Sequence, residues 1–282
     1  MWRTARLLDR SLTGQAITVC DLRWPSLATV DLRGREVLAV VSIGKHLMQR
    51  CAGDLTLHSH LRMEGSWRVS ATGAAAPDRS PQTRAVIGNP VWTAIGRRLG
   101  MLDVVPTSRE DRLVGHLGPD LLGPGWDAAE AARRLAADGA RPVGEALLDQ
   151  RVLAGLGTFY VCEACFLRGV SPWTPVAGAG DPAAFVELAH RLITANRDRT
   201  TQVTTGDARR GQEQYVHARS GLPCRRCGAT VRVAAIGAAP TDRAAFYCPR
   251  CQPGPTPTDD GRRQAPLGHR RPRARGSGYG RH

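Results

Sequence analysis

Residues 147–166 read LLDQRVLAGLGTFYVCEACF, and they combine two helical patterns with a glycine-rich break between them. The apolar pattern of residues 147–152 stops at Gly155-Leu156-Gly157 and resumes at Phe159. Two glycines so close together end one helix and allow the backbone to approach a ligand before the next helix begins. The stretch predicts a helix–turn–helix whose turn can seat an anion at a helix N-terminus. A tight corner within a helical domain is the alternative interpretation.

The charge of the chain points to a polyanionic partner. Its 282 residues carry a formal net charge of +14, with a pI near 10.6. This balance favours nucleic acid over an anionic membrane, because no basic amphipathic helix with a large apolar face stands out. A basic surface without a nucleic-acid role is the alternative. Lys45 is the only lysine among 39 lysine and arginine residues, which predicts a role for its compact ammonium or for its amine.

The sequence shows neither a membrane span nor a signal peptide. No apolar run approaches membrane-spanning length, and the first residues lead into an amphipathic pattern. We expect a soluble, monomeric protein of the bacterial cytoplasm that is associated with the nucleoid and has no membrane partner. The length suits two domains with additional elements.

Hydrophobic periodicity divides the chain into a β-rich first part and a helical second part. The pattern predicts helices at 2–12, 127–138, 143–152 and 182–197, and a polar loop at 70–83. Short strands are expected at 17–19, 30–32, 37–41, 46–51, 55–58, 67–69, 85–87, 91–95 and 101–105, which is typical of an antiparallel sandwich or barrel. The predicted fold class is therefore multidomain α+β. We expect a β-sandwich domain at 1–108 with a leading helix, an all-α domain at 109–203, a cysteine hairpin at 212–253 and a disordered basic tail at 254–282.

Four cysteines have the spacing of a structural zinc site. Cys224-x2-Cys227 and Cys248-x2-Cys251 are separated by 20 residues that read as a hairpin. Each pair places two thiolates at a tight turn, and two such turns complete a closed tetrahedral shell for one Zn²⁺ ion. Two disulfides are the alternative, which an intracellular protein rarely keeps. Cys162 and Cys165 also form a C-x-x-C pair, but no second pair lies near them in the sequence, and we interpret them as core residues.

Two further turns combine charge with an apolar residue. Met63 follows a predicted strand on a glycine-containing turn, which favours an exposed apolar side chain. Arg97-Arg98-Leu99-Gly100 is a basic turn with a leucine at its tip. Charges that hold phosphate beside an apolar wedge suit a protein that extrudes a base from the duplex.

Taken in order, these motifs resemble those of the formamidopyrimidine-DNA glycosylase and endonuclease VIII family of base-excision repair enzymes. The resemblance spans Trp2 to Gln252 and is closest to the actinobacterial endonuclease VIII-like branch. The matching motifs are Gly44-Lys45-His46-Leu47, His60-Leu61-Arg62-Met63-Glu64-Gly65, Leu147-Leu148-Asp149-Gln150 with Ala154-Gly155-Leu156-Gly157, and Arg243-Ala244-Ala245-Phe246-Tyr247-Cys248-Pro249-Arg250-Cys251-Gln252.

The family implies a β-sandwich, a helix–two-turn–helix domain and a zinc-finger hairpin, with damaged double-stranded DNA bound between the lobes. It implies a bifunctional DNA glycosylase and abasic-site lyase that removes oxidised bases, pyrimidines in preference, and nicks the strand by β-elimination. By resemblance Lys45 contacts the phosphate at the lesion and assists the chemistry. The other implied DNA contacts are Gly157 and Thr158 at the helix turn, Arg243 on the zinc finger, and Met63, Arg97 and Leu99 in the hole left by the flipped base.

The sequence departs from the family in two places. The family begins Met-Pro-Glu-Gly-Asp, and its nucleophile is the amine of that proline, with the adjacent glutamate as general acid. Met1 instead stands directly before the Trp-Arg-Thr-Ala of the first helix. We expect a misassigned start and, for the chain as written, no glycosylase activity. The second departure is Thr158, where the family has Asn. A threonine hydroxyl has a shorter reach to phosphate than an amide, so this contact is expected to be weaker.

Two rival functions remain open at this point. A catalytically inactive, zinc-containing protein that binds damaged DNA would account for the missing Pro-Glu start. A protein with the same helical turn and zinc module that acts on RNA is the other rival, and the β-rich N-terminal domain disfavours it.

Overall fold

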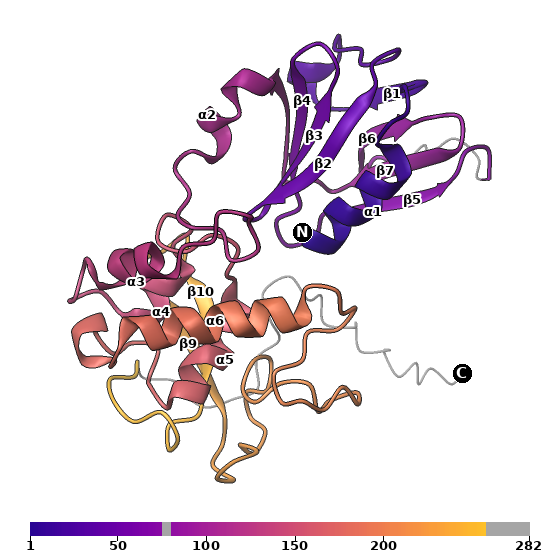
Figure 1. Ribbon diagram of the computed structural model, residues 1–282. Helices are drawn as coiled ribbons and strands as arrows, with labels where there is room; N and C mark the ends of the chain where they lie inside the picture. Colours follow the sequence, from indigo (N-terminus) through magenta and orange to yellow (C-terminus); the bar gives the residue numbers. More distant parts are fainter. Residues whose placement is uncertain (75–79, 258–282) are drawn as a thin grey trace, which may run out of the picture.

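Two lobes make up the structure (Figure 1). The computed structural model describes residues 1–74 and 80–257. The first lobe holds the leading helix α1 (Trp2–Leu12) and two sheets. Helix α1 packs on the sheets because Ala5, Leu8 and Leu12 recur at i, i+3 and i+7 and are buried. The carboxylate of Asp9 also accepts a hydrogen bond of 2.8 Å from the backbone amide of Val40.

Two antiparallel four-stranded sheets enclose the core of the first lobe. Their strand orders are β1-β6-β7-β5 and β2-β3-β4-β8. Inward side chains such as Leu47, Ile87 and Leu102 are fully buried, and each contributes about 1.5–3 kcal/mol. The indole of Trp67 reaches from one sheet to the other and donates to Oγ of Ser59 at 3.1 Å. The strands are β1 (Val19–Leu22), β2 (Val37–Ile43), β3 (His46–Cys51), β4 (Leu55–His60), β5 (Ser66–Ala71), β6 (Thr83–Gly88), β7 (Trp92–Arg97) and β8 (Met101–Pro106).

Helices form the body of the second lobe. Helix α5 runs through its centre, and the side chains from Tyr160 to Phe166 are all buried. Asp127 and Asp181 cap α3 and α6, since each side chain accepts a backbone amide of the first turn at 2.9 Å. The helical segments are η1 (Pro25–Leu27), η2 (Thr107–Arg109), α2 (Asp111–Val114), α3 (Ala128–Ala136), α4 (Val143–Leu148), α5 (Thr158–Arg168), η3 (Val176–Gly178) and α6 (Pro182–Asn196).

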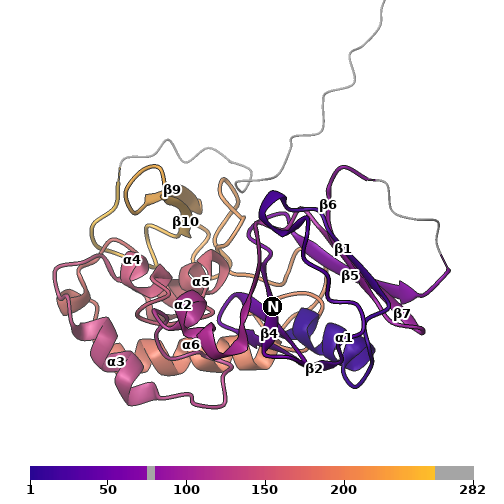
Figure 2. The same cartoon turned by 90° about the horizontal axis from the view of Figure 1, so that it is seen from above.

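A two-stranded hairpin completes the second lobe. Strands β9 (Arg232–Ile236) and β10 (Arg243–Tyr247) are antiparallel, with Arg243 opposite Ile236. Seen from above, the hairpin stands beside α4 and α5, away from α3 and α6 (Figure 2). Phe166 of α5 and Phe246 of β10 share one buried cluster. The hairpin is therefore packed directly on the helix that begins at the glycine turn.

The predicted α+β class is confirmed, and the differences are local. No strand forms at 30–32, where Leu32 is buried among turns. Helix α4 ends at Leu148, four residues early, because Asp149 adopts an extended conformation. Of the predicted loop, residues 75–79 lie outside the described residues, as does the predicted tail beyond residue 257. Within the described ranges, no helix combines the length and the apolar character that crossing a membrane requires.

Candidate nucleic-acid interface and metal centre

The turn that joins β2 to β3 brings Lys45 to the junction of the two lobes. Gly44 adopts a φ of +56°, a conformation that favours glycine. A Cβ at Gly44 would lie 3.2 Å from Cβ of Ala154 and 3.5 Å from the backbone nitrogen of Gly155. The amide of Gly44 donates to Oδ2 of Asp120 at 2.9 Å. A glycine and a carboxylate thus hold this turn against the second lobe.

The turn that precedes α5 is built around Gln150. Its side-chain nitrogen donates to the carbonyls of Leu148 and Leu156, both at 2.9 Å. Its Oε1 accepts from the amide of Gly155 at 3.0 Å, and Gly155 has a φ of +96° that requires glycine. Gly157 is the N-cap of α5 and has no side chain to occupy the first-turn amides. The start of α5 therefore has the chemistry of an anion site.

The ammonium of Lys45 lies over this helix start. Its Nζ is 3.5 Å from the position that a Cβ on Gly157 would take. The pKa of Lys45 is lowered from 10.5 to about 8, chiefly by burial and in addition by the positive charge of Arg243. Desolvation and a neighbouring like charge both disfavour the protonated form. An anion between these groups would relieve both effects.

Arg243 approaches the same place from the hairpin. It is the first residue of β10, its side chain is exposed, and its guanidinium donates to the carbonyls of Thr241 and Asp242 at 2.6 and 3.0 Å. Its positive charge acts electrostatically on Lys45 and lowers the pKa of that residue. Lys45, Arg243 and the α5 start at Thr158 thus converge from three separate segments.

Met63 stands exposed on the turn between β4 and β5. Its side chain is 76% exposed, the largest value among the large hydrophobic side chains of the described residues. An ion pair of 3.0 Å between Arg98 and Glu64 joins this turn to the turn after β7. The stem of Arg62 covers Gly100, where a Cβ would lie 2.4 Å from Cγ of the arginine. The two turns form one braced edge with Met63 at its tip.

The expectation of an exposed apolar tip at Leu99 is wrong. Leu99 is 4% exposed and belongs to the core of the first lobe, where it packs next to Gly96. Arg98 has a φ of +48°, and the chain turns there so that the leucine enters the core, which contributes about 1.5–3 kcal/mol of burial energy. Arg97 ends β7 and is half-buried at the base of the turn.

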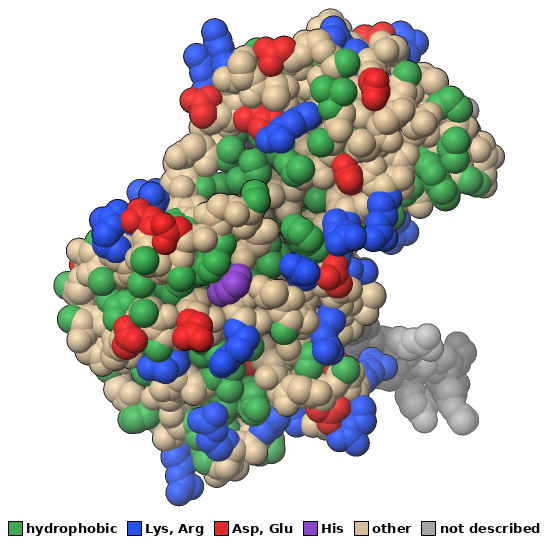
Figure 3. All heavy atoms as spheres, viewed as in Figure 1, with side chains coloured by type: hydrophobic (Ala, Val, Ile, Leu, Met, Phe, Trp, Pro, Cys, Tyr) green, Lys and Arg blue, Asp and Glu red, His purple; other side chains and the backbone are tan. Residues whose placement is uncertain are grey.

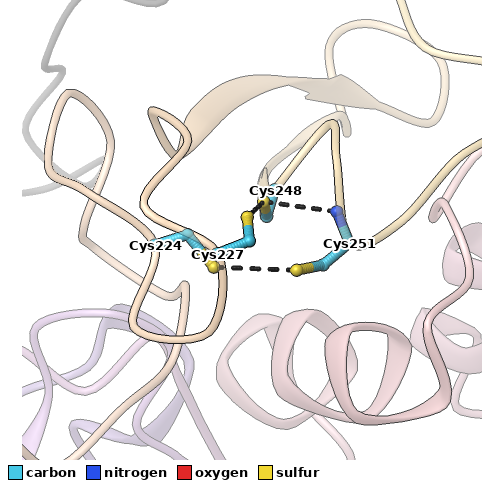
Figure 4. A group of neighbouring side chains, drawn as sticks. All are labelled: Cys224, Cys227, Cys248 and Cys251. Atoms are coloured by element: carbon cyan, nitrogen blue, oxygen red, sulfur yellow. Dashed lines mark hydrogen bonds between the residues drawn. The ribbon is translucent and has the colours of Figure 1, made fainter.

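The four cysteines of the hairpin module converge on one point (Figure 4). Their ligand atoms all lie within 4.8 Å of one another. Sγ atoms are 3.9 Å apart for Cys224 and Cys251 and 3.5 Å apart for Cys227 and Cys248. A zinc ion with Zn–S distances of about 2.3 Å requires sulfur atoms about 3.8 Å apart, whereas a disulfide requires about 2.05 Å. The cluster therefore fits a metal ion held by four thiolates.

Three histidines near the Lys45 turn, His46, His58 and His60, add no positive charge to the site. Nδ1 of His46 lies 2.8 Å from Nε2 of His58, whose Nδ1 lies 3.3 Å from Oδ2 of Asp103. Burial lowers the pKa of His46 and of His60 to about 4. The rings are neutral at neutral pH, so the positive charge at the junction comes from the ammonium and the guanidinium.

The amino group of Met1 also lies near the junction. Burial lowers its pKa, and the charges of Arg3 and Lys45 act in the same direction. The indole of Trp2 donates to Oδ1 of Asp198 at 3.2 Å, which links the start of α1 to the second lobe.

A basic hollow lies between α1 and the end of α6. Its volume is about 450 Å³, and its lining residues include Arg3, Arg6, Arg10 and Asp198. Figure 3 shows lysine and arginine side chains on both sides of the notch between the lobes, over α1 and the end of α6. Part of the positive charge of the sequence thus lies where the lobes face each other.

Two site residues escaped the sequence analysis. Asp120 fixes the Lys45 turn, and Gln252 braces the second cysteine pair by accepting from the amide of Cys248 at 2.8 Å and donating to the carbonyl of Val170 at 2.9 Å. The Gly118-Pro119-Asp120 sequence signals an ordered turn, but nothing local identifies the partner of its carboxylate.

Comparison with known proteins places this architecture in a family. The sequence model described as "Formamidopyrimidine-DNA glycosylase N-terminal domain" matches residues 2–102. A Streptomyces coelicolor protein named "Probable endonuclease 8 2" is 50% identical over 265 residues, which cover 93% of this chain and 95% of that protein. A Mycolicibacterium smegmatis DNA-(apurinic or apyrimidinic site) lyase is 44% identical over 252 residues, with 89% and 96% covered.

A solved structure shows the same fold. The formamidopyrimidine-DNA glycosylase of Lactococcus lactis, crystallised with DNA that contains an abasic site, superposes with a TM-score of 0.73 at 21% identity and covers 90% of this chain and 98% of its own. The relatives at 44–50% identity span nearly the whole chain. The chain belongs to the family of formamidopyrimidine-DNA glycosylases and endonuclease VIII enzymes.

Proposed function

We propose that this protein is a base-excision repair DNA glycosylase and abasic-site lyase that acts on damaged double-stranded DNA. The observation that carries the proposal is the convergence of Lys45, the α5 start and Arg243 on one anion site. A phosphate there would neutralise the two like charges and accept the amides of the helix start. The names of the relatives support the same activity.

Each part of the interface then has a role. Lys45, Gly157, Thr158 and Arg243 bind the phosphates around the lesion, and Lys45 assists the chemistry. Met63, exposed at its braced edge, fills the hole left by the extruded base, with Arg97 beside it. Leu99 has no such role in this proposal, because it is buried.

The four cysteines hold one structural Zn²⁺ ion in this proposal. Four thiolates in a closed tetrahedron suit zinc and leave no open coordination position. The ion supplies folding energy to the hairpin that carries Arg243, and it takes no part in the reaction. The three domains span residues 1–108, 109–203 and 212–253. The protein acts in the cytoplasm, on the nucleoid.

An amine provides the nucleophile in this family. Its lone pair attacks C1′ of the damaged nucleotide, and the bond to the base breaks as the departing base takes up a proton. Cleavage of the C1′–O4′ bond, with a proton transferred to O4′, then opens the sugar and gives an iminium. This iminium withdraws electrons for the elimination that nicks the strand. The family's proline would stand ahead of Met1, whose own amine lies at the junction. By family likeness the preferred bases are oxidised pyrimidines.

Borohydride trapping on abasic-site DNA tests the proposal. The reductant converts the iminium into a stable covalent adduct between protein and DNA. Two forms are compared, the sequence as printed and the same sequence preceded by Met-Pro-Glu-Gly-Asp-Thr. An adduct supports the enzyme, and DNA binding without an adduct in either form supports the inactive damaged-DNA-binding protein instead.

A further inference from the structure

Glu163 is a buried carboxylate that the proposed chemistry does not use. It lies on α5 and is 0% exposed, which is rare for a charged side chain without partners. Its Oε1 accepts the amides of Val216 and His217 at 2.8 and 2.9 Å. Its Oε2 accepts the amide of Tyr215 at 2.8 Å and the hydroxyl of Thr204. Four donors thus converge on one side chain.

These donors belong to the segment that leads from α6 into the cysteine module. Thr204 lies where the segment begins, and residues 215–217 lie shortly before the first cysteine pair. Arg225, between Cys224 and Cys227, donates back to the carbonyl of Gln214 at 2.9 Å. The carboxylate therefore fixes the entry of the hairpin module to α5.

The neighbouring residue, Cys162, contacts the second strand of the hairpin. Sγ of Cys162 accepts the amide of Phe246 at 3.2 Å. Phe246 lies in β10, three residues after Arg243, and both belong to the same short strand. Cys162 and Glu163, four and five residues after α5 begins at Thr158, thus contact the second hairpin strand and the entry segment of the module.

We propose that Glu163 is a positioning residue that holds Arg243 in register with the start of α5, so that both grip the same stretch of DNA backbone. The inference rests on the proposed function. Hydrogen bonds to a carboxylate are stronger than neutral ones, and a donor left without its partner in the interior is costly. Through these hydrogen bonds, Glu163 fixes the distance between two phosphate-binding groups, Arg243 and the start of α5.

Glu163→Gln is the direct test. The amide keeps the shape of the side chain, but its NH2 group would face backbone N–H groups that need an acceptor. We expect affinity for a duplex with a stable abasic-site analogue to fall about tenfold, as for one lost charge-assisted contact, with zinc content unchanged. Glu187→Gln on α6 removes the same charge from an exposed position and serves as the matched control.

A double-mutant cycle separates positioning from general damage. If Glu163 acts through Arg243, Glu163→Gln adds nothing to the loss already caused by Arg243→Ala. When Glu163→Gln is combined with Met63→Ala, the two fold-losses in DNA affinity should multiply. Losses that multiply with Arg243→Ala as well would overturn the inference.

The only lysine offers a readout that needs no DNA. Lysine labelled with ¹³C at Cε gives one resonance, which reports the titration of Lys45. Because Arg243 lowers the pKa of Lys45, both Arg243→Ala and Glu163→Gln should raise it. An unchanged pKa in folded Glu163→Gln, with a shift in Arg243→Ala, would contradict the inference.

A milder variant covers the case in which Glu163→Gln does not fold. Thr204→Val removes the hydroxyl donor and leaves the three backbone amides in place. It should weaken DNA binding by a smaller factor, again without effect in the Arg243→Ala background. Failure of the unmodified protein to bind abasic-site DNA would count against the proposed function, whereas normal binding by Thr204→Val would count against the role of Glu163.

Discussion

The backbone amide of Gly44 donates a hydrogen bond of 2.9 Å to Oδ2 of Asp120, across the junction between the two lobes. Oδ1 of the same carboxylate accepts the amide of Leu122 at 3.2 Å. Asp120 is thus held by its own loop while it holds the turn that carries Lys45. The position of the ammonium over Gly157 depends on this contact.

Asp120→Ala should weaken binding to abasic-site DNA more than it lowers stability. The loss of a hydrogen bond to a charged acceptor costs about 1.5–3 kcal/mol, and the freed turn no longer presents Lys45 to the phosphate. We expect a roughly ten- to hundredfold increase in Kd by fluorescence anisotropy, by the same estimate. Asp127→Ala, which removes the cap of α3 away from the junction, is the control for lost stability. Equal Kd values for both variants would show that Asp120 has no part in the site.

DNA binding should weaken as the pH rises above about 8. The pKa of Lys45 lies near 8 in the free protein, so the ammonium loses its proton above that value. A bound phosphate favours the charged form and moves the midpoint of the affinity curve upward. Affinity measured between pH 7 and 9.5 should decline for the unmodified chain and stay flat for Lys45→Met. The same slope in both proteins would rule out Lys45 as the titrating group.

Stability should change with pH in the opposite sense. Because the pKa of Lys45 in the folded chain is lowered from 10.5 to about 8, the folded chain binds fewer protons than the unfolded chain between these values. The contribution of Lys45 to the free energy of unfolding therefore rises with pH in that window. Urea unfolding at pH 7.5 and 10 should show a larger gain for the unmodified chain than for Lys45→Met.

Thr158→Asn should tighten binding to abasic-site DNA. The residue opens α5 at the anion site, and an amide donor reaches farther than a hydroxyl. We expect a two- to fivefold lower Kd, as for one neutral hydrogen bond. No gain would mean that the backbone amides of the turn carry the contact alone.

Zinc removal should abolish DNA binding and spare the first lobe. The cysteines pack in a buried cluster of the second lobe, and the β-sandwich encloses a separate cluster of its own. Chelation should release one zinc ion, disorder the hairpin with Arg243, and leave the spectroscopic signature of the β-sandwich. Unchanged affinity after chelation would contradict a structural role for the metal in DNA binding.

The sequence predicted those features whose cause is local. A few neighbouring residues were enough to predict the Cys-x2-Cys zinc site, the role of the single lysine and the glycine turn. Asp120 could not be predicted, because its partner Gly44 is 76 residues away. Glu163 was hidden for the same reason, since its donors lie 41 to 54 residues along the chain.

Leu99 shows the opposite failure. An apolar residue on a charged turn fits both an exposed wedge and a core anchor, and only the surrounding packing decides between them. Here the left-handed conformation of Arg98 turns the chain, and the missing side chain at Gly96 leaves room that Leu99 fills in the core. The missing strand at 30–32 has a similar origin, because burial of Leu32 needs no strand partner.

The central claim is that the convergence of Lys45, the α5 start and Arg243 serves amine-based lyase chemistry on damaged DNA. Borohydride trapping on a duplex with one abasic site tests it most directly. We predict a covalent adduct with the chain that begins Met-Pro-Glu-Gly-Asp-Thr, reduced at least tenfold in Lys45→Ala and Arg243→Ala, in line with the loss of one charged contact. Tight binding by that chain without any adduct would contradict the claim and identify a damaged-DNA-binding protein without catalytic activity.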